Sequence, residues 1–262
     1  MLSLEGKTIL VTGGAGIGVG GGICQAIDLL GGRLIVNDLA QDRAERAAQQ
    51  YQQAVAIAAD VASADAVAAM FAELEARGIM LDGLVNNAGV GLSQLAHTAS
   101  EAEFDRLMGI DLRGVWLMAK AFTNHVMQTG KKTASIVNVS SVHAQTTMAR
   151  YALYASAKSG VEGLTRGLAV ELGPLNIRCN ALAPGYVHSE QNIDLIKTWS
   201  DDPEQWIKAH SVNQQALEFR IEPLDCGWLA AFLVSDLSRA ITGQVIRIDA
   251  GMTALIYNKD FF

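Results

Sequence analysis

Apolar, β-branched runs alternate with helical stretches along the whole chain, which is the pattern of βαβ units around a parallel sheet. Most of these runs contain no regular polar alternation, as expected of strands that helices cover on both faces. Seven segments have this character: Thr8–Val11, Leu34–Val36, Ala54–Ile57, Gly83–Asn86, Ser135–Val139, Ile177–Leu182 and Val245–Ile248. The pattern therefore predicts an α/β fold with a doubly wound, seven-stranded parallel sheet and helices on both faces.

Between the predicted strands, apolar residues recur every three or four positions, which indicates amphipathic helices. Residues 63–77 have four apolar residues at this spacing. Ser100 is followed by Glu103 three residues later, a capping box that opens another helix. Pro223 suits the first turn of a further helix, where a missing N–H is tolerated.

No linker, repeat or low-complexity segment interrupts this alternation, so residues 1–262 are predicted to form a single domain. The longest departure is a helical excursion over residues 186–222, between the sixth and seventh strands. Ligands of open α/β sheets bind beyond the carboxyl ends of the strands. We therefore expect this excursion to cover the substrate.

The net charge and the short apolar runs of the sequence limit the kinds of partner. The formal net charge of −7 argues against nucleic acid, whose binding requires neutralised phosphates. The chain has no polybasic tract and no apolar run long enough to cross a bilayer, so no membrane partner is expected. The N-terminal residues do not resemble a signal peptide.

Three cysteines lie far apart, without metal-ligand spacing, in apolar surroundings: Cys24, Cys179 and Cys226. They are predicted to be small core residues rather than disulfide partners. No cluster of His, Asp and Glu has metal-site spacing either, so no metal is expected. These features favour the cytoplasm.

A glycine-rich loop, residues 12–22, follows the first strand and precedes a helix. Glycines allow a sharp turn and bring backbone N–H groups against a pyrophosphate at a helix N-terminus. Such a loop alone is also compatible with a plain glycine-rich turn. Its place after an apolar strand, together with Asp38 at the end of the next strand, favours a Rossmann-type dinucleotide site.

Asp38 also bears on the choice of cofactor. A carboxylate there accepts hydrogen bonds from the adenosine ribose and repels a 2′-phosphate. No arginine stands immediately beside it in the sequence to bind such a phosphate. The alternative is a surface acid or a cap at a strand end. The sequence favours NAD as the cofactor.

Further motifs follow in a fixed order, and together they carry a resemblance to a known family. They are the glycine loop, Asp60-Val61, Asn86-Asn87-Ala88-Gly89, Ser140-Ser141, Tyr154-Ala155-Ser156-Ala157-Lys158 and Pro184-Gly185-Tyr186-Val187. Over nearly its full length the chain resembles the classical short-chain dehydrogenase/reductase family. The resemblance implies an oxidoreductase with Ser141, Tyr154 and Lys158 as catalytic residues and a homotetramer or homodimer as the assembly.

The resemblance also implies which residues hold the cofactor. They lie in the glycine loop, after the second, third, fourth and sixth strands, and in the catalytic segment: Gly13, Gly16, Ile17, Gly18, Gly20, Asp38, Leu39, Asp60, Val61, Asn87, Ala88, Gly89, Tyr154, Lys158, Pro184, Gly185, Val187 and Ser189.

The chain departs from the family pattern at two places. The glycine loop has one residue more than usual, so that either Gly16-Ile17-Gly18 or Gly18-Val19-Gly20 corresponds to the family's Gly-Ile-Gly. Asp111 stands where the family has a helical asparagine that supports a proton relay. Aspartate keeps an acceptor, loses the amide donor and adds charge. Asp111 is assigned to the catalytic group, with a structural helix contact as the alternative.

The catalytic residues suit a reaction that moves a hydride and a proton. Lys158 lies four residues after Tyr154, so on a helix both side chains emerge on one face. A nearby cation favours an ionised tyrosine, which can take a proton from an alcohol. Ser141 follows a strand and can hydrogen-bond the substrate oxygen. Tyr151 has no lysine four residues on.

Substrate contacts are expected from residues beside these motifs: Ser141, His143, Gln145, Tyr154 and Tyr186. This mixed set suits a polyol, sugar, hydroxyacid or cyclic alcohol. The leading hypothesis is an NAD-dependent dehydrogenase of secondary alcohols. The alternatives are a ketoreductase of 3-oxoacyl or cyclic ketone substrates and a non-catalytic dinucleotide-binding sensor or scaffold.

Two surfaces are expected to contact a second subunit. The resemblance implies that the helices around Phe104–Met127 and Tyr154–Leu172 pair across a two-fold axis. The aromatic C-terminal segment, Ile256–Phe262, is predicted to dock against a neighbouring subunit.

Overall fold

In the computed structural model, which describes residues 2–198 and 200–256, seven parallel strands form one sheet in the order β3-β2-β1-β4-β5-β6-β7. The strands are β1 Thr8–Thr12, β2 Arg33–Asp38, β3 Ala54–Ala58, β4 Gly83–Asn86, β5 Ala134–Val139, β6 Ile177–Pro184 and β7 Val245–Ile248. The strand order reverses between β1 and β4, which makes this the point where such sheets bind ligands. The predicted fold class is confirmed.

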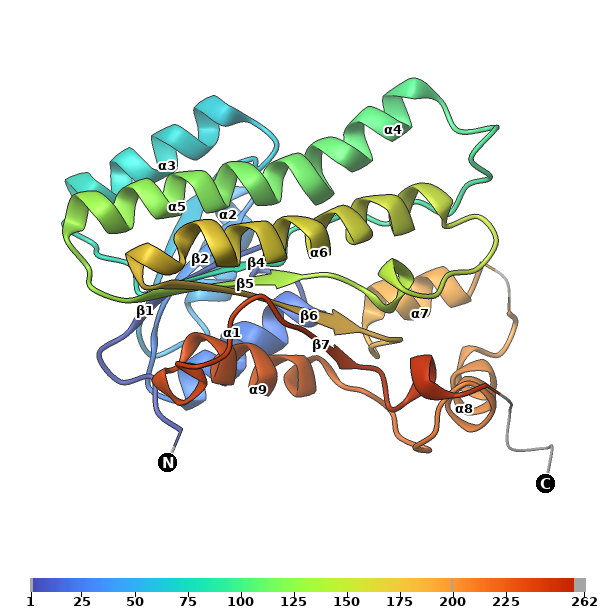
Figure 1. Ribbon diagram of the computed structural model, residues 1–262. Coiled ribbons are helices and arrows are strands. Elements are labelled where there is room, and N and C mark those ends of the chain that lie inside the picture. Colours follow the sequence, from blue (N-terminus) through green and yellow to red (C-terminus); the bar gives the residue numbers. More distant parts are fainter. Residues whose placement is uncertain (1, 199, 257–262) are drawn as a thin grey trace.

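Helices cover both faces of the sheet (Figure 1). One apolar core lies under α3 (Ala64–Ala76), α5 (Val115–Thr129) and α6 (Ala152–Leu172). The other lies under α1 (Val19–Leu29), α2 (Gln41–Ala48) and α9 (Pro223–Val234). The remaining elements are α4 Glu101–Met108, α7 Glu190–Ile196, α8 Pro203–Asn213, the π-helical turn η1 Gly109–Gly114, and the 3₁₀ turns η2 Val142–Ala144, η3 Gly173–Leu175, η4 Asp236–Ser238 and η5 Met252–Ala254.

Helices α1 and α9 touch backbone to backbone. A Cβ atom on Gly22 would lie 2.1 Å from the carbonyl of Pro223, and one on Gly227 would lie 2.2 Å from the Gly22 carbonyl oxygen. Two glycines in register therefore bring α9 onto α1 and fix the helix that follows the glycine loop.

Local signals in the sequence set the helix starts. The Ser63 hydroxyl accepts the Ala66 N–H at 3.2 Å. The capping box of Ser100 and Glu103 is present, with the Ser100 N–H donating to the Glu103 carboxylate at 2.8 Å. Pro223 occupies the first turn of α9 as predicted. The three cysteines are buried free thiols, in agreement with the sequence.

The strand ends were harder to predict than the strands. β2 continues through Asn37 and Asp38, although both are polar. The Asn37 side chain is buried because its amide donates to the carbonyls of Ile57 (3.1 Å) and Ala59 (3.2 Å). The predicted long helix at Phe104–Met127 also differs, since η1 separates α4 from α5.

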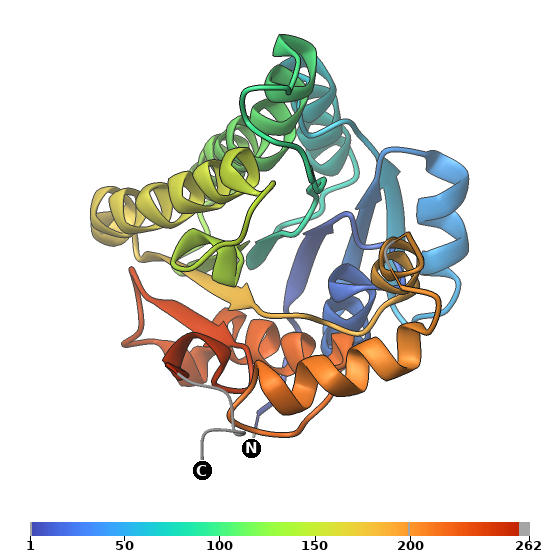
Figure 2. The ribbon, with the colours of Figure 1, turned by 90° about the vertical axis from the view of Figure 1, so that its right-hand side faces the viewer.

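The segment between β6 and α9 lies beyond the carboxyl ends of the strands. In Figure 1 the strand arrows point toward the side where α7 and α8 lie, and Figure 2 views the molecule from that side. Trp199 and residues 257–262, with the predicted docking of the C-terminal segment, fall outside the described residues. Of the helices in residues 2–198 and 200–256, none is long and apolar enough to cross a membrane.

Candidate active site

The glycine loop ends in a helix start that is open to an anion. Gly18 is the N-cap of α1, makes no side-chain cap, and precedes a first turn without acidic residues. The first N–H groups of such a helix attract negative charge. The helix begins at Val19, so Gly18-Val19-Gly20 is the segment that opens it. Gly20 must be glycine because a Cβ there would lie 2.3 Å from the Gly13 carbonyl oxygen.

The end of β4 holds the glycine loop in place. The Asn87 side-chain amide donates to the carbonyls of Thr12 (3.0 Å) and Gly13 (3.2 Å). The backbone N–H groups of Asn87 and Ala88 both donate to the Thr12 hydroxyl at 3.0 Å. The structure therefore shows these two residues organising the loop from the neighbouring strand.

Asp38 closes β2 with its carboxylate almost fully buried. Oδ1 accepts the Leu39 N–H at 2.9 Å, and the Leu39 side chain itself is exposed. Arg43 Nε of α2 lies 3.6 Å from the same oxygen. Sequence adjacency did not reveal this arginine, since the first turn of α2 brings it back toward the strand end.

The segments that follow β3 and β6 lie at the same end of the parallel sheet as the glycine loop. Asp60 is exposed and accepts the Ala62 N–H at 2.9 Å, whereas Val61 packs into the core. After β6, which ends at Pro184, the N–H of Gly185 donates to Ile248 and Val187 is buried. The side chain of Ser189 lies beside Gly18, because a Cβ on Gly18 would be 3.6 Å from Ser189 Cβ.

Together these features fit a dinucleotide. An uncapped helix start without acids suits the pyrophosphate, and a buried carboxylate at the end of the next strand suits a ribose. The segment after β6 lies beside Gly18 of the glycine loop, although β6 is on the other side of the point between β1 and β4 where the strand order reverses.

His143 contacts both Ser141 and Tyr154. Ser141 follows β5, is 7% exposed, and its Oγ accepts the His143 N–H at 3.2 Å. The His143 ring contacts the Tyr154 ring edge to face, with centroids 5.7 Å apart. Burial lowers the pKa of His143, which keeps the ring neutral near pH 7. Gln145, just beyond η2, is exposed.

Lys158 extends from α6 into a buried site, as its spacing from Tyr154 predicted. Its ammonium lies 5.5 Å from the centre of the Tyr154 ring and donates to the Val139 carbonyl at 3.2 Å. Asp111 Oδ2, from η1, is 3.1 Å from the same nitrogen. The structure thus brings Asp111, Tyr154 and Lys158 together.

Aromatic side chains gather where the substrate is expected. Tyr151 stacks on His143, with ring centroids 4.7 Å apart. Beyond β6, Tyr186 packs edge to face against Trp206 and His210 of α8 at 5.7 and 5.4 Å. Trp206 and His210 are four residues apart and stack on each other at 5.1 Å.

The sequence reasoning missed a buried polar chain that supports the site. Asn86 donates to Asn138 at 2.9 Å, and Asn138 donates to the Thr165 hydroxyl at 2.9 Å. This chain joins β4 and β5 to α6, the helix that carries Tyr154 and Lys158. The signal in the sequence was an asparagine inside each apolar strand. His210 was also missed, although its spacing from Trp206 placed both on one helix face.

The comparisons with known proteins show which family the chain is similar to. A family model described as enoyl-(acyl carrier protein) reductase matches residues 14–253. The oxidoreductase UcpA of Salmonella typhimurium is 35% identical over 261 residues, which cover 97% of each chain. Glucose 1-dehydrogenase 2 of Bacillus subtilis is 31% identical and is matched over 95% of this chain and 96% of its own.

The chain is also similar to a solved structure. A protein from Agrobacterium tumefaciens, described as a candidate gluconate dehydrogenase, superposes with a TM-score of 0.89 at 28% identity, covering 97% of this chain and 99% of that one. The chain belongs to the classical short-chain dehydrogenase/reductase family. Dehydrogenases of this family use a nicotinamide dinucleotide, so the family and the glycine loop agree on the class of cofactor.

Proposed function

We propose that this protein is an NAD-dependent dehydrogenase that interconverts a secondary alcohol and its ketone, with Tyr154 as the acid/base. The observation that carries the proposal is the buried Lys158 ammonium beside the Tyr154 ring, at the sheet edge that also holds the glycine loop. The same pair of residues on a helix far from the glycine loop would not lie beside a dinucleotide.

The side chains divide the proton chemistry between them. A nicotinamide held at this site would take a hydride from the carbinol carbon in oxidation or give one to the carbonyl carbon in reduction. Tyr154 takes the hydroxyl proton during oxidation and returns it during reduction, while the Lys158 cation favours the ionised phenol. Ser141 Oγ accepts from the His143 N–H, which leaves its own hydrogen free to bond the substrate oxygen.

NAD is preferred over NADP because of Asp38. Its carboxylate is buried at the position where the adenosine ribose binds in this fold, and a 2′-phosphate would meet that charge. Arg43 faces the carboxylate at 3.6 Å and offsets part of the repulsion. We infer a preference for NAD that depends on this one carboxylate.

A neutral sugar or polyol is the substrate class that the site fits best. Burial lowers the pKa of His143 and of His210, so both rings are neutral. Burial and the Glu204 carboxylate raise the pKa of Tyr186 to about 12, and its buried hydroxyl has no hydrogen-bond partner in the described residues. Neutral donors and aromatic faces suit hydroxyl groups. One relative is named for glucose, a neutral sugar.

A second candidate is a ketoreductase of 3-oxoacyl substrates. The 3-oxoacyl-[acyl-carrier-protein] reductase FabG of Staphylococcus aureus is 33% identical over 251 residues. Reductive synthesis usually draws on NADPH, which Asp38 disfavours. Activity with NADPH and a 3-oxoacyl thioester, without activity on sugars, would support this candidate.

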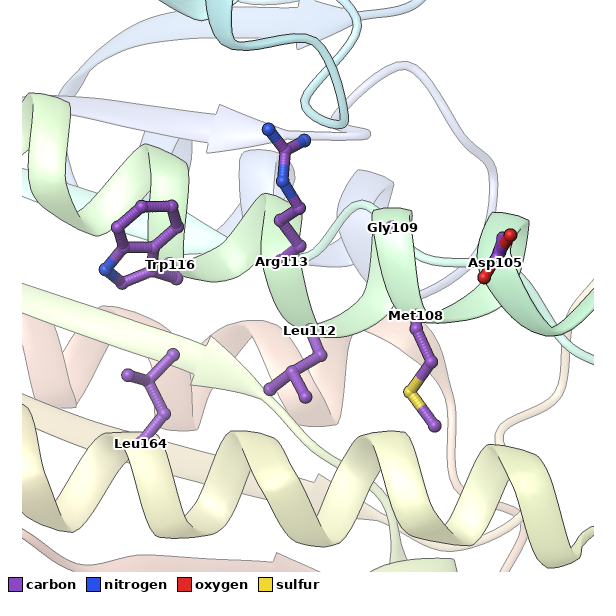
Figure 3. Close-up of a pocket in the computed structure, with 7 residues that line it drawn as sticks. All are labelled: Asp105, Met108, Gly109, Leu112, Arg113, Trp116 and Leu164. Carbon is purple, nitrogen blue, oxygen red and sulfur yellow. The ribbon is translucent and has the colours of Figure 1, made fainter.

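The remaining proposals concern organisation. We infer a single domain in which α7 and α8 cover the substrate, and a cytoplasmic homotetramer or homodimer. An open groove between η1, its neighbouring helices and α6 supports the assembly (Figure 3), and it is lined by Asp105, Met108, Gly109, Leu112, Arg113, Trp116 and Leu164. Trp116 is 43% exposed there and lies beside Met108, Leu112 and Leu164, which together form a contiguous apolar surface that a second subunit would cover.

Changing the groove tests the assembly. Trp116→Arg is expected to dissociate the protein into monomers because it places a charge in an apolar contact. Mass by light scattering measures the result, and Trp228→Arg on the exposed side of α9 is the matched control. An unchanged mass for both variants would remove this groove as the contact.

The function itself is tested by NADH formation. Purified protein is incubated with NAD or NADP and a panel of sugars, polyols, hydroxyacids and cyclic alcohols, beside a Tyr154→Phe variant. We expect NADH from at least one sugar or polyol, and a loss of rate of at least about a hundredfold in the variant. Cofactor binding without turnover across the panel would favour the sensor or scaffold.

A further inference from the structure

Asp111 is fully buried beside the proposed catalytic lysine. It lies in η1, a π-helical turn between α4 and α5. Such turns widen a helix locally and often occur at functional sites. The turn directs Asp111 inward, while Leu112 and Arg113 line the outer groove (Figure 3).

The two carboxylate oxygens have separate partners. Oδ1 accepts the backbone N–H of Val90 at 2.7 Å, and Oδ2 lies 3.1 Å from Lys158 Nζ. Within the described residues Oδ2 has no hydrogen-bond partner, so the ion pair is its polar contact. An asparagine has one acceptor oxygen, and its amide would point a donor at either Val90 or Lys158. The surroundings of Asp111 therefore require two acceptors.

Gly89 leaves the space for this pair. A Cβ atom on Gly89 would lie 3.0 Å from Asp111 Oδ2 and 3.4 Å from Lys158 Nζ. The absence of a side chain at Gly89 allows the carboxylate and the ammonium to approach each other beside the end of β4. Three separate elements thus accommodate the ion pair.

The ion pair lowers the net positive charge beside the Tyr154 ring. Burial would lower the pKa of Lys158, but the attraction of Tyr154 and of Asp111 outweighs burial and holds that pKa above its ordinary value. Lys158 therefore stays protonated. A protonated lysine paired with a carboxylate presents less net positive charge to a neighbouring phenol than an unpaired one does.

We propose that Asp111 is a positioning residue that holds the Lys158 ammonium and offsets part of its charge, so that the ionised form of Tyr154 appears at higher pH than in an Asp111→Asn variant. This rests on the proposed function for its catalytic consequence, since it sets the pH at which Tyr154 can accept a proton. Asp111 acts through Lys158 and contacts neither substrate nor cofactor in the proposal.

The titratable groups around the pair come from few elements. In the described chain, Tyr154 of α6 and Asp111 of η1 act on the Lys158 ammonium. β5 contributes the uncharged Val139 carbonyl, and the end of β4 contributes Gly89. Tyr154 also meets the rings of Tyr151 and His143, and burial keeps His143 neutral.

Tyrosinate absorbance of the cofactor-free protein tests the proposal without turnover. The chain has five tyrosines, so the titration of Tyr154 is isolated by subtracting the curve of a Tyr154→Phe variant. The same subtraction is made in an Asp111→Asn background. We expect the midpoint to fall, by on the order of one pH unit, because the variant leaves the Lys158 cation without its carboxylate partner.

The matched control removes a carboxylate charge from the far end of α6, the helix that carries Tyr154 and Lys158. Glu171 is exposed on α6, thirteen residues after Lys158 and about 20 Å along the helix. Glu171→Gln is expected to leave the midpoint unchanged. If Asp111→Asn fails to fold, Asp111→Ser keeps an acceptor toward Val90 without the charge and carries the same expectation.

The outcomes separate this inference from the proposed function. A lower midpoint in the neutral variants, together with a matching acid shift in the rise of kcat/KM with pH, supports the role of Asp111. A midpoint that stays or rises overturns it, even if alcohols are oxidised normally. A lower midpoint with no turnover on any alcohol would leave the role of Asp111 intact and remove the proposed function.

Discussion

On the side of Tyr154 that faces Lys158, hydrogen bonds and an ion pair hold the residues, whereas on the side of His143 and Tyr151 the contacts are mainly between aromatic rings. The first side is buried and charged: Lys158 is 5% exposed and Asp111 is 0% exposed. The second is built from ring contacts at 4.7 to 6.2 Å. Charge and direction fix the first arrangement, while rings can shift and still pack.

This difference indicates a division of labour. Polar networks in a buried site tolerate little displacement, because each unpaired group costs about 1–3 kcal/mol. That suits the side that must hold a proton acceptor against the cofactor. A ring surface gives contact area without strict direction, which suits substrates that differ in the position of a hydroxyl group.

The largest expected effect comes from Lys158, on the charged side. Lys158→Met keeps most of the side-chain volume and removes the cation, so kcat/KM should fall at least about a hundredfold. The fall should be greatest at neutral pH, where the ionised phenol depends most on the cation. The rate of NADH formation between pH 6 and 10 measures it.

Lys120→Met is the matched control for this change. Lys120 is exposed on α5, with its ammonium over the Trp116 ring. Its replacement should leave the rate within about twofold, since cation–π pairs at exposed sites are worth only about 0.5–1 kcal/mol. A Lys158→Met variant as active as the Lys120→Met variant would contradict the role of the cation.

The next effect concerns Asp38. Asp38→Asn should lower the preference for NAD over NADP at least about tenfold, because a buried charge facing a phosphate is worth more than about 1.4 kcal/mol. The released Arg43 guanidinium then faces the 2′-phosphate. The ratio of kcat/KM for the two cofactors is the measurement.

Asp42→Asn serves as the comparison for Asp38. Asp42 is exposed on α2 beside Arg43 and pairs with Arg46. If Asp42→Asn changed the cofactor ratio as much as Asp38→Asn does, the general charge of α2 rather than the buried carboxylate would be responsible.

A smaller effect is expected in the aromatic cluster beyond β6, which Tyr186, Trp206 and His210 form. Trp206→Ala removes the face that stacks on His210 and contacts Tyr186. KM for the alcohol should rise about three- to tenfold, while KM for NAD stays unchanged, since stacked ring pairs are worth about 0.5–1.5 kcal/mol. Trp228→Ala, on α9, controls for loss of a large ring. Equal changes in both KM values would show that α8 supports the whole site rather than the substrate.

The sequence predicted the charged side better than the aromatic cluster beyond β6, for physical reasons. Tyr154 and Lys158 are one helical turn apart, so their proximity is local and follows from α6 alone. Asp38 was placed by the end of a strand. Arg43 and the Asn86–Asn138 contact depend on how neighbouring elements pack, and residue spacing along the chain does not contain that information.

The aromatic cluster of Tyr186, Trp206 and His210 depends on segments that are distant in the chain. Tyr186 meets Trp206 and His210 only after α8 folds back beside the end of β6, across twenty or more residues. Apolar periodicity predicted helices there but no contact. The π-helical turn at Asp111 was also beyond periodicity, because one widened turn hardly changes the apolar pattern of a long helix.

The central claim, hydride transfer between an alcohol and nicotinamide with Tyr154 moving the proton, is tested most directly with an isotope. A sugar or polyol that supports NADH formation is prepared with deuterium on the carbinol carbon, and the reduced cofactor is examined by mass spectrometry. The claim predicts one deuterium in each molecule of NADH formed and loss of the reaction in Tyr154→Phe. NADH without deuterium, or an equal yield from the variant, would contradict it.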